Sequence, residues 1–322
     1  MGPAPHNESC SDTQPGRLMR NRIRWRQLLR MSAESALTIR PIRSALERRS
    51  RGRSVVVAYH NIIPNDELMT GDPGAHLRLS DFQQHLDLLS RHFQVVPLEE
   101  VFTPQAVDGP LRIAITFDDA YRGTILLGLP ELVKRQLPAT VFIPTGLLGK
   151  GPFWWDEFEF SGWEGERIPL RQLRGHYPAV RAWALASGWK PRPQGPFQIP
   201  ASEAEFLAAA SSAVGIRFGT HTVSHRNLSE LSEQEVRDEL ETSLEWFSKR
   251  GISPSPWLSY PYGLTGPHVE AGAKECGLEG ALTITGGPVR PPVDNRFRAP
   301  RVNVPAGVSQ QGLMLRIFGL PR

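Results

Sequence analysis

Cysteine is almost absent from this sequence: two of the 322 residues are cysteines, Cys10 and Cys276. Two distant cysteines exclude a disulfide framework and are too few for a metal site built on cysteine ligands. Long apolar runs are also missing, and no stretch reaches the roughly 18 residues that a membrane-spanning helix needs. The first residues contain no continuous apolar segment typical of a secretory signal. The sequence therefore predicts a cytoplasmic protein, although a periplasmic protein without disulfides would have the same composition.

Lysine is missing from residues 1–53, where twelve arginines stand against four acidic residues and give a formal charge of +8. Because the whole chain carries +4, residues 54–322 carry −4. Such a basic segment is typical of contact with an anionic partner. We expect either a flexible, solvated extension or contact with the inner face of an anionic membrane, with residues 23–37 as an amphipathic helix. Residues 54–322 lack the basic, aromatic-interleaved pattern of nucleic-acid binding, so we expect no such partner.

Apolar segments rich in β-branched residues alternate with segments of helical periodicity from residue 54 onward. Residues 54–62, 111–117 and 138–146 have the composition of buried strands, and residues 79–93 and 231–251 have apolar residues at helical spacing. This alternation predicts an α/β protein with a parallel sheet, either open or closed into a barrel. In such sheets, functional groups collect beyond the carboxyl ends of the strands.

Two of the expected helices have capping-box signatures at their starts. Ser80 is followed by Gln83, and Ser232 is followed by Glu235, at the spacing that lets each pair satisfy backbone N–H groups reciprocally. We therefore expect helices that begin directly after Ser80 and Ser232.

The alternation of strands and helices is interrupted at about residues 147–200. This segment contains five of the eight tryptophans and a cluster of prolines, and residues 190–200 have the composition of a loop. We interpret it as an insertion within a domain that spans residues 54–322. Insertions of this size usually lie over the functional face, so we expect this one near the site.

Polar motifs follow four of the expected strands. His60 ends one apolar run, Asp118 and Asp119 end the next, and His221 with His225 follows a third. The fourth motif is the sequence YPYG at residues 260–263. A parallel barrel would bring these strand ends together at one mouth.

His221 and His225 are four residues apart, a spacing at which one helical turn places both imidazoles on one face. A histidine pair alone is weak evidence for a metal, but a carboxylate at a neighbouring strand end completes a common catalytic triad of ligands. We expect one divalent metal ion there. Zinc suits these ligands best, and cobalt, nickel or iron would also fit.

The adjacent Asp118 and Asp119 would repel each other unless a cation lies near them. One aspartate would ligate the metal, and the other would act as general base toward a water molecule that the metal activates. A strand end is where both side chains can turn toward one pocket, because the pleat is lost there. An ordinary helix cap is the alternative interpretation of this pair.

Three of these motifs, TFDDAY, HTVSH and YPYG, resemble the first three motifs of the polysaccharide deacetylases, the NodB-homology group of carbohydrate esterase family 4. The resemblance extends from about Val55 to Val304. It implies a distorted (β/α) barrel of about seven parallel strands, with N-acetylated sugars of a polysaccharide or lipid-linked glycan as the substrate class. It also implies that Asp118 is the catalytic base, and that the metal ligands are Asp119, His221 and His225.

The sequence departs from the family pattern at two positions that matter for catalysis. Ser259 occupies the place of an arginine that orients the base, and the usual C-terminal histidine motif is missing. The segment VVVAYHNI resembles a strand of circularly permuted members, which include poly-N-acetylglucosamine deacetylases. That resemblance implies His60 as the general acid. A packing histidine at a strand end is the alternative.

Substrate contacts are expected from the insertion and from the third motif. Trp154 and Trp155 would stack on sugar rings, Asp156 would bind hydroxyls, and Pro261 and Tyr262 would lie beside the reacting group. The tryptophans would otherwise simply hold the insertion against the barrel. Two other functions stay open: a hydrolase of the same fold acting on another amide or imide, and a catalytically silent carbohydrate-binding protein.

Overall fold

The structure is a computed structural model that describes residues 39–158 and 168–320. Its main sheet follows one path of seven strands, and every neighbouring pair is parallel. In order across the sheet they are β10 (Val302–Asn303), β1 (Ser54–Tyr59), β5 (Arg112–Phe117), β6 (Ala139–Ile143), β7 (Ile216–Thr220), β8 (Trp257–Ser259) and β9 (Gly280–Leu282). This arrangement confirms the predicted distorted barrel of about seven parallel strands.

Smaller strands accompany this sheet. The short strand β4 (Gln94–Val95) pairs with the start of β5. Strands β2 (Asn61–Ile63) and β3 (His76–Arg78) form a separate parallel ribbon. The sequence predicts one strand over residues 54–62, but the chain breaks at His60, because β2 leaves the barrel to pair with β3.

A single segment, from Ala299 to Asn303, connects the two edges of the sheet. The Ala299 N–H donates to the Ala281 carbonyl of β9 at 3.0 Å. Three residues later, Val302 and Asn303 pair with β1. The segment therefore crosses from β9 to β1, and Arg301 lies between these two contacts.

The interior of the barrel contains an apolar cluster of side chains from five of its strands. Val56, Ala114, Phe142, Trp257 and Leu282 pack there together with residues of the short helix α4 (Leu98–Val101). The ring of Phe102, just after α4, stacks on Trp257 with 4.4 Å between centroids.

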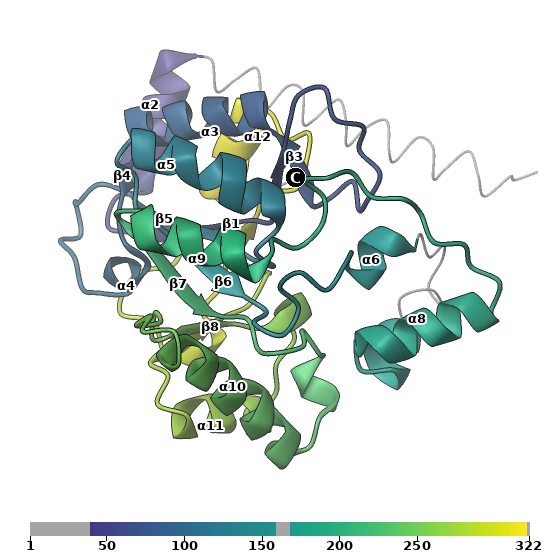
Figure 1. The fold of residues 1–322 in the computed structure, drawn as a ribbon. Helices are drawn as coiled ribbons and strands as arrows, with labels where there is room; N and C mark the ends of the chain where they lie inside the picture. Colours follow the sequence, from purple (N-terminus) through teal and green to yellow (C-terminus); the bar gives the residue numbers. More distant parts are fainter. Residues whose placement is uncertain (1–38, 159–167, 321–322) are drawn as a thin grey trace, which may run out of the picture.

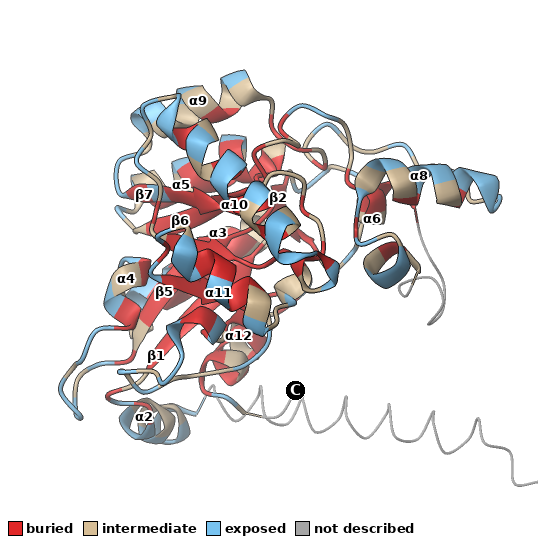
Figure 2. Cartoon of the chain, turned by 90° about the horizontal axis from the view of Figure 1, so that it is seen from below, coloured by how far each residue is buried: buried red, intermediate tan, exposed pale blue. Residues whose placement is uncertain are grey.

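Helices cover the outer surface of the sheet in two groups (Figure 1). One group consists of α3 (Leu79–His92), the π-helical turn η1 (Thr124–Gly128) continued by α5 (Leu129–Lys134), α9 (Glu203–Ser212) and α12 (Gln310–Ile317). The other consists of α10 (Glu233–Ser248) and α11 (Pro267–Glu275). Burial is concentrated in the strands and on the inner faces of these helices, as Figure 2 shows. No helix in the described ranges is long and apolar enough to cross a membrane.

The two capping predictions have opposite outcomes. Helix α10 begins at a complete capping box of Ser232 and Glu235, as predicted. The prediction at Ser80 is wrong, because α3 begins at Leu79, directly after β3. Ser80 therefore lies inside the first turn, where its N–H donates to Asn65 Oδ1 at 3.0 Å.

The described part of the insertion, residues 147–158 and 168–200, contains three short helical elements, α6 (Trp154–Glu157), η2 (Ile168–Gln172) and α8 (Tyr177–Ala186). They lie at the carboxyl ends of the strands (Figure 1). On the other side of the barrel lies α2 (Arg40–Arg49), a helix that the sequence did not predict. The predicted amphipathic helix at residues 23–37 lies outside the described residues.

Candidate active site

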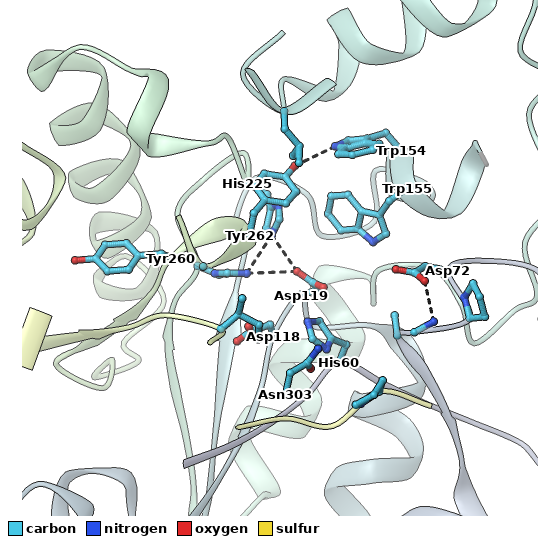
Figure 3. A pocket seen from close by; sticks show the side chains of 18 of the residues that line it. His60, Asp72, Asp118, Asp119, Trp154, Trp155, His225, Tyr260, Tyr262 and Asn303 are labelled. Atoms are coloured by element: carbon cyan, nitrogen blue, oxygen red, sulfur yellow. Dashed lines mark hydrogen bonds and ion pairs between the residues drawn. The ribbon is translucent and has the colours of Figure 1, made fainter. Parts of the chain in front are cut away.

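The strand ends of β1, β5, β7 and β8 surround one cavity of about 710 Å³. The cavity is lined by side chains from all four predicted motifs and from the insertion (Figure 3). The predicted residues that it brings together are His60, Asp118, Asp119, His221, His225, Tyr262, Trp154 and Trp155. These residues come from segments up to about 200 positions apart, so parallel topology gathers them.

Both aspartates face this cavity because the chain changes conformation between them. Ala114 and Thr116 are on the interior face of β5, and Asp118 continues that alternation. Strand geometry would send Asp119 to the other side. Instead, Asp119 and Ala120 adopt left-handed backbone conformations, with φ of 72° and 52°. Such conformations are costly for residues other than glycine and cluster at functional sites.

Asp119, His221 and His225 form a group of potential metal ligands whose atoms all lie within 4.8 Å of one another. Asp119 Oδ1 is 3.4 Å from His221 Nε2 and 3.2 Å from His225 Nε2. Among the described residues, no hydrogen-bond donor satisfies this buried oxygen. His221 Nδ1 lies 2.6 Å from the Ser259 carbonyl, and a proton there leaves Nε2 with a free lone pair. The donor set therefore fits a divalent cation with borderline N and O ligands.

The charges of this group also favour a cation. Burial lowers the pKa of His221, but the carboxylates of Asp118 and Asp119 outweigh this effect and hold it above its ordinary value. Burial and the neighbouring His221 hold the pKa of His225 below its ordinary value, which favours the neutral form that binds metals. Burial would raise the pKa of Asp119, yet the two adjacent imidazoles lower it far below the usual range. The two carboxylates thus stabilise positive charge at the imidazoles, which a bound cation would supply in place of a proton.

The prediction that one helical turn aligns His221 and His225 is wrong. Residues 221–225 form a loop in which Thr222 and His225 have φ of 67° and 55°. The Thr222 N–H donates to Thr220 Oγ1, and the His225 N–H donates to Thr222 Oγ1, each at 3.0 Å. These side-chain hydrogen bonds replace the helical ones, and the loop brings the two Nε2 atoms to 3.1 Å.

Glu239, which reaches the loop from α10, holds it from outside. Its carboxylate oxygen Oε2 accepts hydrogen bonds from the N–H groups of Val223 and Ser224 at 3.0 and 2.9 Å. The other oxygen, Oε1, accepts the Ser224 hydroxyl. On the opposite side, the Gly146 N–H donates to the Val223 carbonyl at 2.8 Å. A side chain at Gly146 would collide with Val223, since its Cβ would lie 2.7 Å from Val223 Cγ1. Sequence analysis missed Glu239, because its partners are backbone groups of a distant loop.

We predict that Glu239→Gln weakens metal binding by about 10-fold or more. This is the lower end of the loss of metal affinity seen when groups that orient metal ligands are changed. The amide would present N–H groups to two backbone donors, so the loop would lose one of its anchors. Glu241→Gln, at an exposed position of the same helix, is the matched control. Competitive titration of metal-free protein measures the dissociation constant. Equal metal affinities of the two variants would show that Glu239 does not hold the loop in its metal-binding conformation.

Arg301 is the functional side chain that sequence analysis missed most plainly. It is fully buried and donates to both carboxylate oxygens of Asp118, at 2.9 and 2.7 Å. It also donates to Ser259 Oγ at 2.9 Å and to the Thr283 carbonyl at 2.8 Å. Ser259 stands where the family pattern has an arginine, and here a guanidinium reaches Asp118 from a different segment. In the sequence, Arg301 stands directly before Val302 and Asn303 and belongs to none of the four motifs.

The ion pair sets the charge state of Asp118. Burial would raise the pKa of this carboxyl, but the guanidinium of Arg301, with a smaller contribution from His221, holds it below its ordinary value. Asp118 is therefore ionised at neutral pH, as a general base must be.

We predict that Arg301→Met lowers the free energy of unfolding by about 3 kcal/mol, because it leaves the Asp118 charge buried without its partner. Arg298→Met is the matched control: Arg298 pairs with Glu270, but its side chain is 55% exposed, and such pairs contribute at most about 1 kcal/mol. Urea unfolding of both variants provides the measurement. Similar decreases in the free energy of unfolding in the two variants would show that the pair of Arg301 and Asp118 does not stabilise the fold.

His60 lies at the end of β1 and lines the cavity beside Asn303 (Figure 3). Its Nδ1 atom is buried and has no hydrogen-bond partner among the described residues, and the same is true of Asn303 Oδ1. The His60 carbonyl accepts the Thr124 hydroxyl at 2.6 Å, which fixes its backbone. The His60 ring therefore lines the cavity, and no hydrogen bond at Nδ1 ties it to the described residues around it.

Two predicted substrate contacts are wrong. Asp156 is completely buried: it accepts hydrogen bonds from the Tyr121 hydroxyl, the His76 ring and the Asp72 N–H, so sugar hydroxyls cannot reach it. Pro261 is buried in the turn η4 (Pro261–Gly263) and does not line the cavity. The following residue, Tyr262, does line it.

A cluster of carboxylates and imidazoles at the mouth of a parallel barrel defines a hydrolase-like site. The family model for polysaccharide deacetylases matches residues 107–281, more than half of the chain. The chain therefore belongs to the polysaccharide deacetylase family, as its motifs predicted. The match includes β5 to β9, whereas the strand that carries His60 lies ahead of it.

Solved structures with the same fold include the following three proteins. A Streptococcus pyogenes deacetylase, PplD, is 16% identical, with coverage of 82% of this chain and 98% of that chain and a TM-score of 0.59. IcaB from Ammonifex degensii is 18% identical, with coverage of 78% and 91% and a TM-score of 0.54. The BpsB deacetylase domain from Bordetella bronchiseptica is 19% identical, with coverage of 79% and 96% and a TM-score of 0.51. At these identities the similarity establishes the fold. No curated protein sequence matches the chain.

Proposed function

We propose that this protein removes acetyl groups from N-acetylated sugars of a polysaccharide or lipid-linked glycan with the help of one divalent cation. One observation carries the proposal: an ionised, Arg301-bound Asp118 lies beside the buried group of Asp119, His221 and His225, in a cavity walled by tryptophans. This combination supplies a base, a metal site and an apolar surface for a sugar. Membership of the deacetylase family supports the same reaction.

The residues of the chain take distinct parts in the reaction. A cation held by Asp119, His221 and His225, zinc in our proposal, would polarise the scissile carbonyl and activate water toward attack. Asp118 would accept the proton of the attacking water, since its oxygens retain lone pairs beyond those that Arg301 occupies. His60 would donate a proton to the departing amine. Tyr262 and Trp155 would shield these groups from bulk water.

We expect His60→Ala to lower kcat on an N-acetylated sugar by about 10²- to 10⁴-fold, because the amine leaves poorly without a proton donor. The variant should lose far less activity on 4-nitrophenyl acetate, whose phenolate leaves without protonation. Steady-state kinetics on both substrates makes the comparison. Equal losses on the two substrates would show that His60 is not the general acid.

Hydrolysis of a panel of substrates tests the function itself, with acetate release measured for the acetylated members and ring opening for the cyclic ones. The panel contains N-acetylglucosamine oligosaccharides, O-acetylated oligosaccharides, and a cyclic amide and imide. Acetate from the N-acetylated members supports the proposal. Hydrolysis of only the cyclic compounds would favour another C–N hydrolase, and sugar binding without acetate release would favour a catalytically silent binding protein.

We also propose that the basic surface around α2 contacts anionic lipid. Ile39 and Ile42 are 50% and 40% exposed, and several arginines beside them are exposed as well. These arginines are Arg40, Arg48, Arg49 and Arg51. Exposed apolar side chains among arginines suit an interfacial helix. Co-sedimentation of the full chain with phosphatidylglycerol vesicles, and not with phosphatidylcholine vesicles, is the expected result. A cytoplasmic location at the inner face of a membrane stays a prediction.

A further inference from the structure

The two histidines of the proposed metal site are held in different ways. His221 Nδ1 lies 2.6 Å from the Ser259 carbonyl, the usual arrangement for a metal-binding histidine. His225 Nδ1 is buried but has no hydrogen-bond partner among the described residues. If Nε2 is the atom that binds the metal, no hydrogen bond at Nδ1 from the part of the chain that the structure describes fixes the orientation of the His225 ring.

Aromatic rings surround His225 instead. The centroid of Tyr262 lies 4.6 Å from that of His225 at an interplanar angle of 80°, and the centroid of Trp155 lies at 4.8 Å and 47°. Phe153 is farther, at 6.3 Å, and stacks on Trp155 with 4.6 Å between centroids and only 6° between planes. The imidazole is thus packed on two sides, and Figure 3 shows Trp155, Tyr262 and His225 together above Asp119.

Trp155 is itself held by a buried chain of hydrogen bonds. Its Nε1–H donates to the Tyr121 hydroxyl at 2.9 Å, and that hydroxyl donates to Asp156 Oδ2 at 2.6 Å. Burial and the nearby Asp156 carboxylate raise the pKa of Tyr121, so the hydroxyl keeps the proton that it donates. Asp156 Oδ1 accepts from His76 Nε2 at 3.1 Å and from the Asp72 N–H at 2.8 Å. Each donor in this chain has an acceptor, which fixes the indole plane.

We propose that Trp155 and Asp156 are positioning residues of the metal site. Asp156 orients the Tyr121 hydroxyl, the hydroxyl orients the Trp155 indole, and the indole holds the His225 ring in the orientation that binds the metal. The insertion would then control metal retention as well as contact with the sugar. This inference rests on the proposed function, because it requires that His225 is a metal ligand.

The test measures the affinity of metal-free full-length protein for Co²⁺, whose visible absorption reports the ligand geometry independently of activity. Trp155→Ala should weaken binding by about 10- to 100-fold, the effect typical of groups that orient metal ligands. Trp155→Phe keeps a ring against His225 but loses the hydrogen bond to Tyr121, so an intermediate loss is expected. Trp183→Ala is the matched control, since Trp183 belongs to the same insertion but does not line the cavity. Circular dichroism verifies that each variant is folded.

The outcomes separate this inference from the proposed function. Weaker Co²⁺ binding by Trp155→Ala with unchanged binding by Trp183→Ala supports the inference. Native Co²⁺ affinity in Trp155→Ala, with a raised KM for the sugar, would overturn it and leave Trp155 as a stacking platform only, while the proposed function stands. Failure of the native protein itself to bind Co²⁺ would overturn both.

Discussion

Asp118→Asn should reduce kcat by about 10²- to 10⁴-fold and leave the metal content unchanged. Asparagine has nearly the same shape as aspartate, but its amide cannot accept the proton of the attacking water. The metal content should persist because the three proposed ligands lie on other residues, Asp119, His221 and His225. Acetate release and elemental analysis of the same preparation give the two numbers.

One control is needed because Arg301 would lose its anionic partner in this variant. Removal of one partner of a buried pair destabilises a protein. Unfolding must therefore be followed, and activity compared well below the unfolding transition. Wild-type turnover by a folded Asp118→Asn protein would show that another group is the base.

His221→Ala should abolish both metal binding and turnover. The imidazole supplies one of three converging ligands, and its Nδ1 contact with the Ser259 carbonyl also ties the loop to β8. Two remaining ligands leave too few donors for a tightly held divalent ion. Elemental analysis after dialysis and acetate release provide the readouts, and addition of excess zinc should restore little activity.

His268→Ala is the matched control for this prediction. His268 lies on α11 outside the cavity, and its Nε2 lies 3.1 Å from the Leu231 carbonyl. Its loss should leave metal content and kcat near native values. Full metal content in His221→Ala would show that the ion, if present, is bound elsewhere, and the assignment of the three ligands would fail.

These two predictions distinguish the residue that we propose as the base from the residues that we propose as metal ligands. Asp118 and Asp119 are adjacent in sequence, yet Arg301 binds only the first and the histidines approach only the second. The left-handed backbone at Asp119 makes this division possible, because it points the second carboxylate to a different part of the same cavity.

The local pattern of the sequence was sufficient for a parallel α/β sheet and for most of the site, and the resemblance to the deacetylases added the distorted barrel. Apolar β-branched runs ended at His60, at Asp118 and before His221, and those ends are where the structure places the cavity. The reason is that strand propensity and burial act over a few neighbouring residues, while parallel pairing aligns all carboxyl ends at one edge. The capping box at Ser232 was predictable for the same reason, since both partners lie within one turn.

The sequence alone thus determined which side chains stand at the strand ends, but the tertiary structure decided what surrounds them. Arg301 meets Asp118 across 183 positions, and Glu239 holds a loop of another element. Asp156 followed two tryptophans and was predicted to face the sugar, yet three donors from distant segments enclose it. Hydrogen bonds and ion pairs of this kind depend on where separate elements pack, and no local periodicity encodes that position.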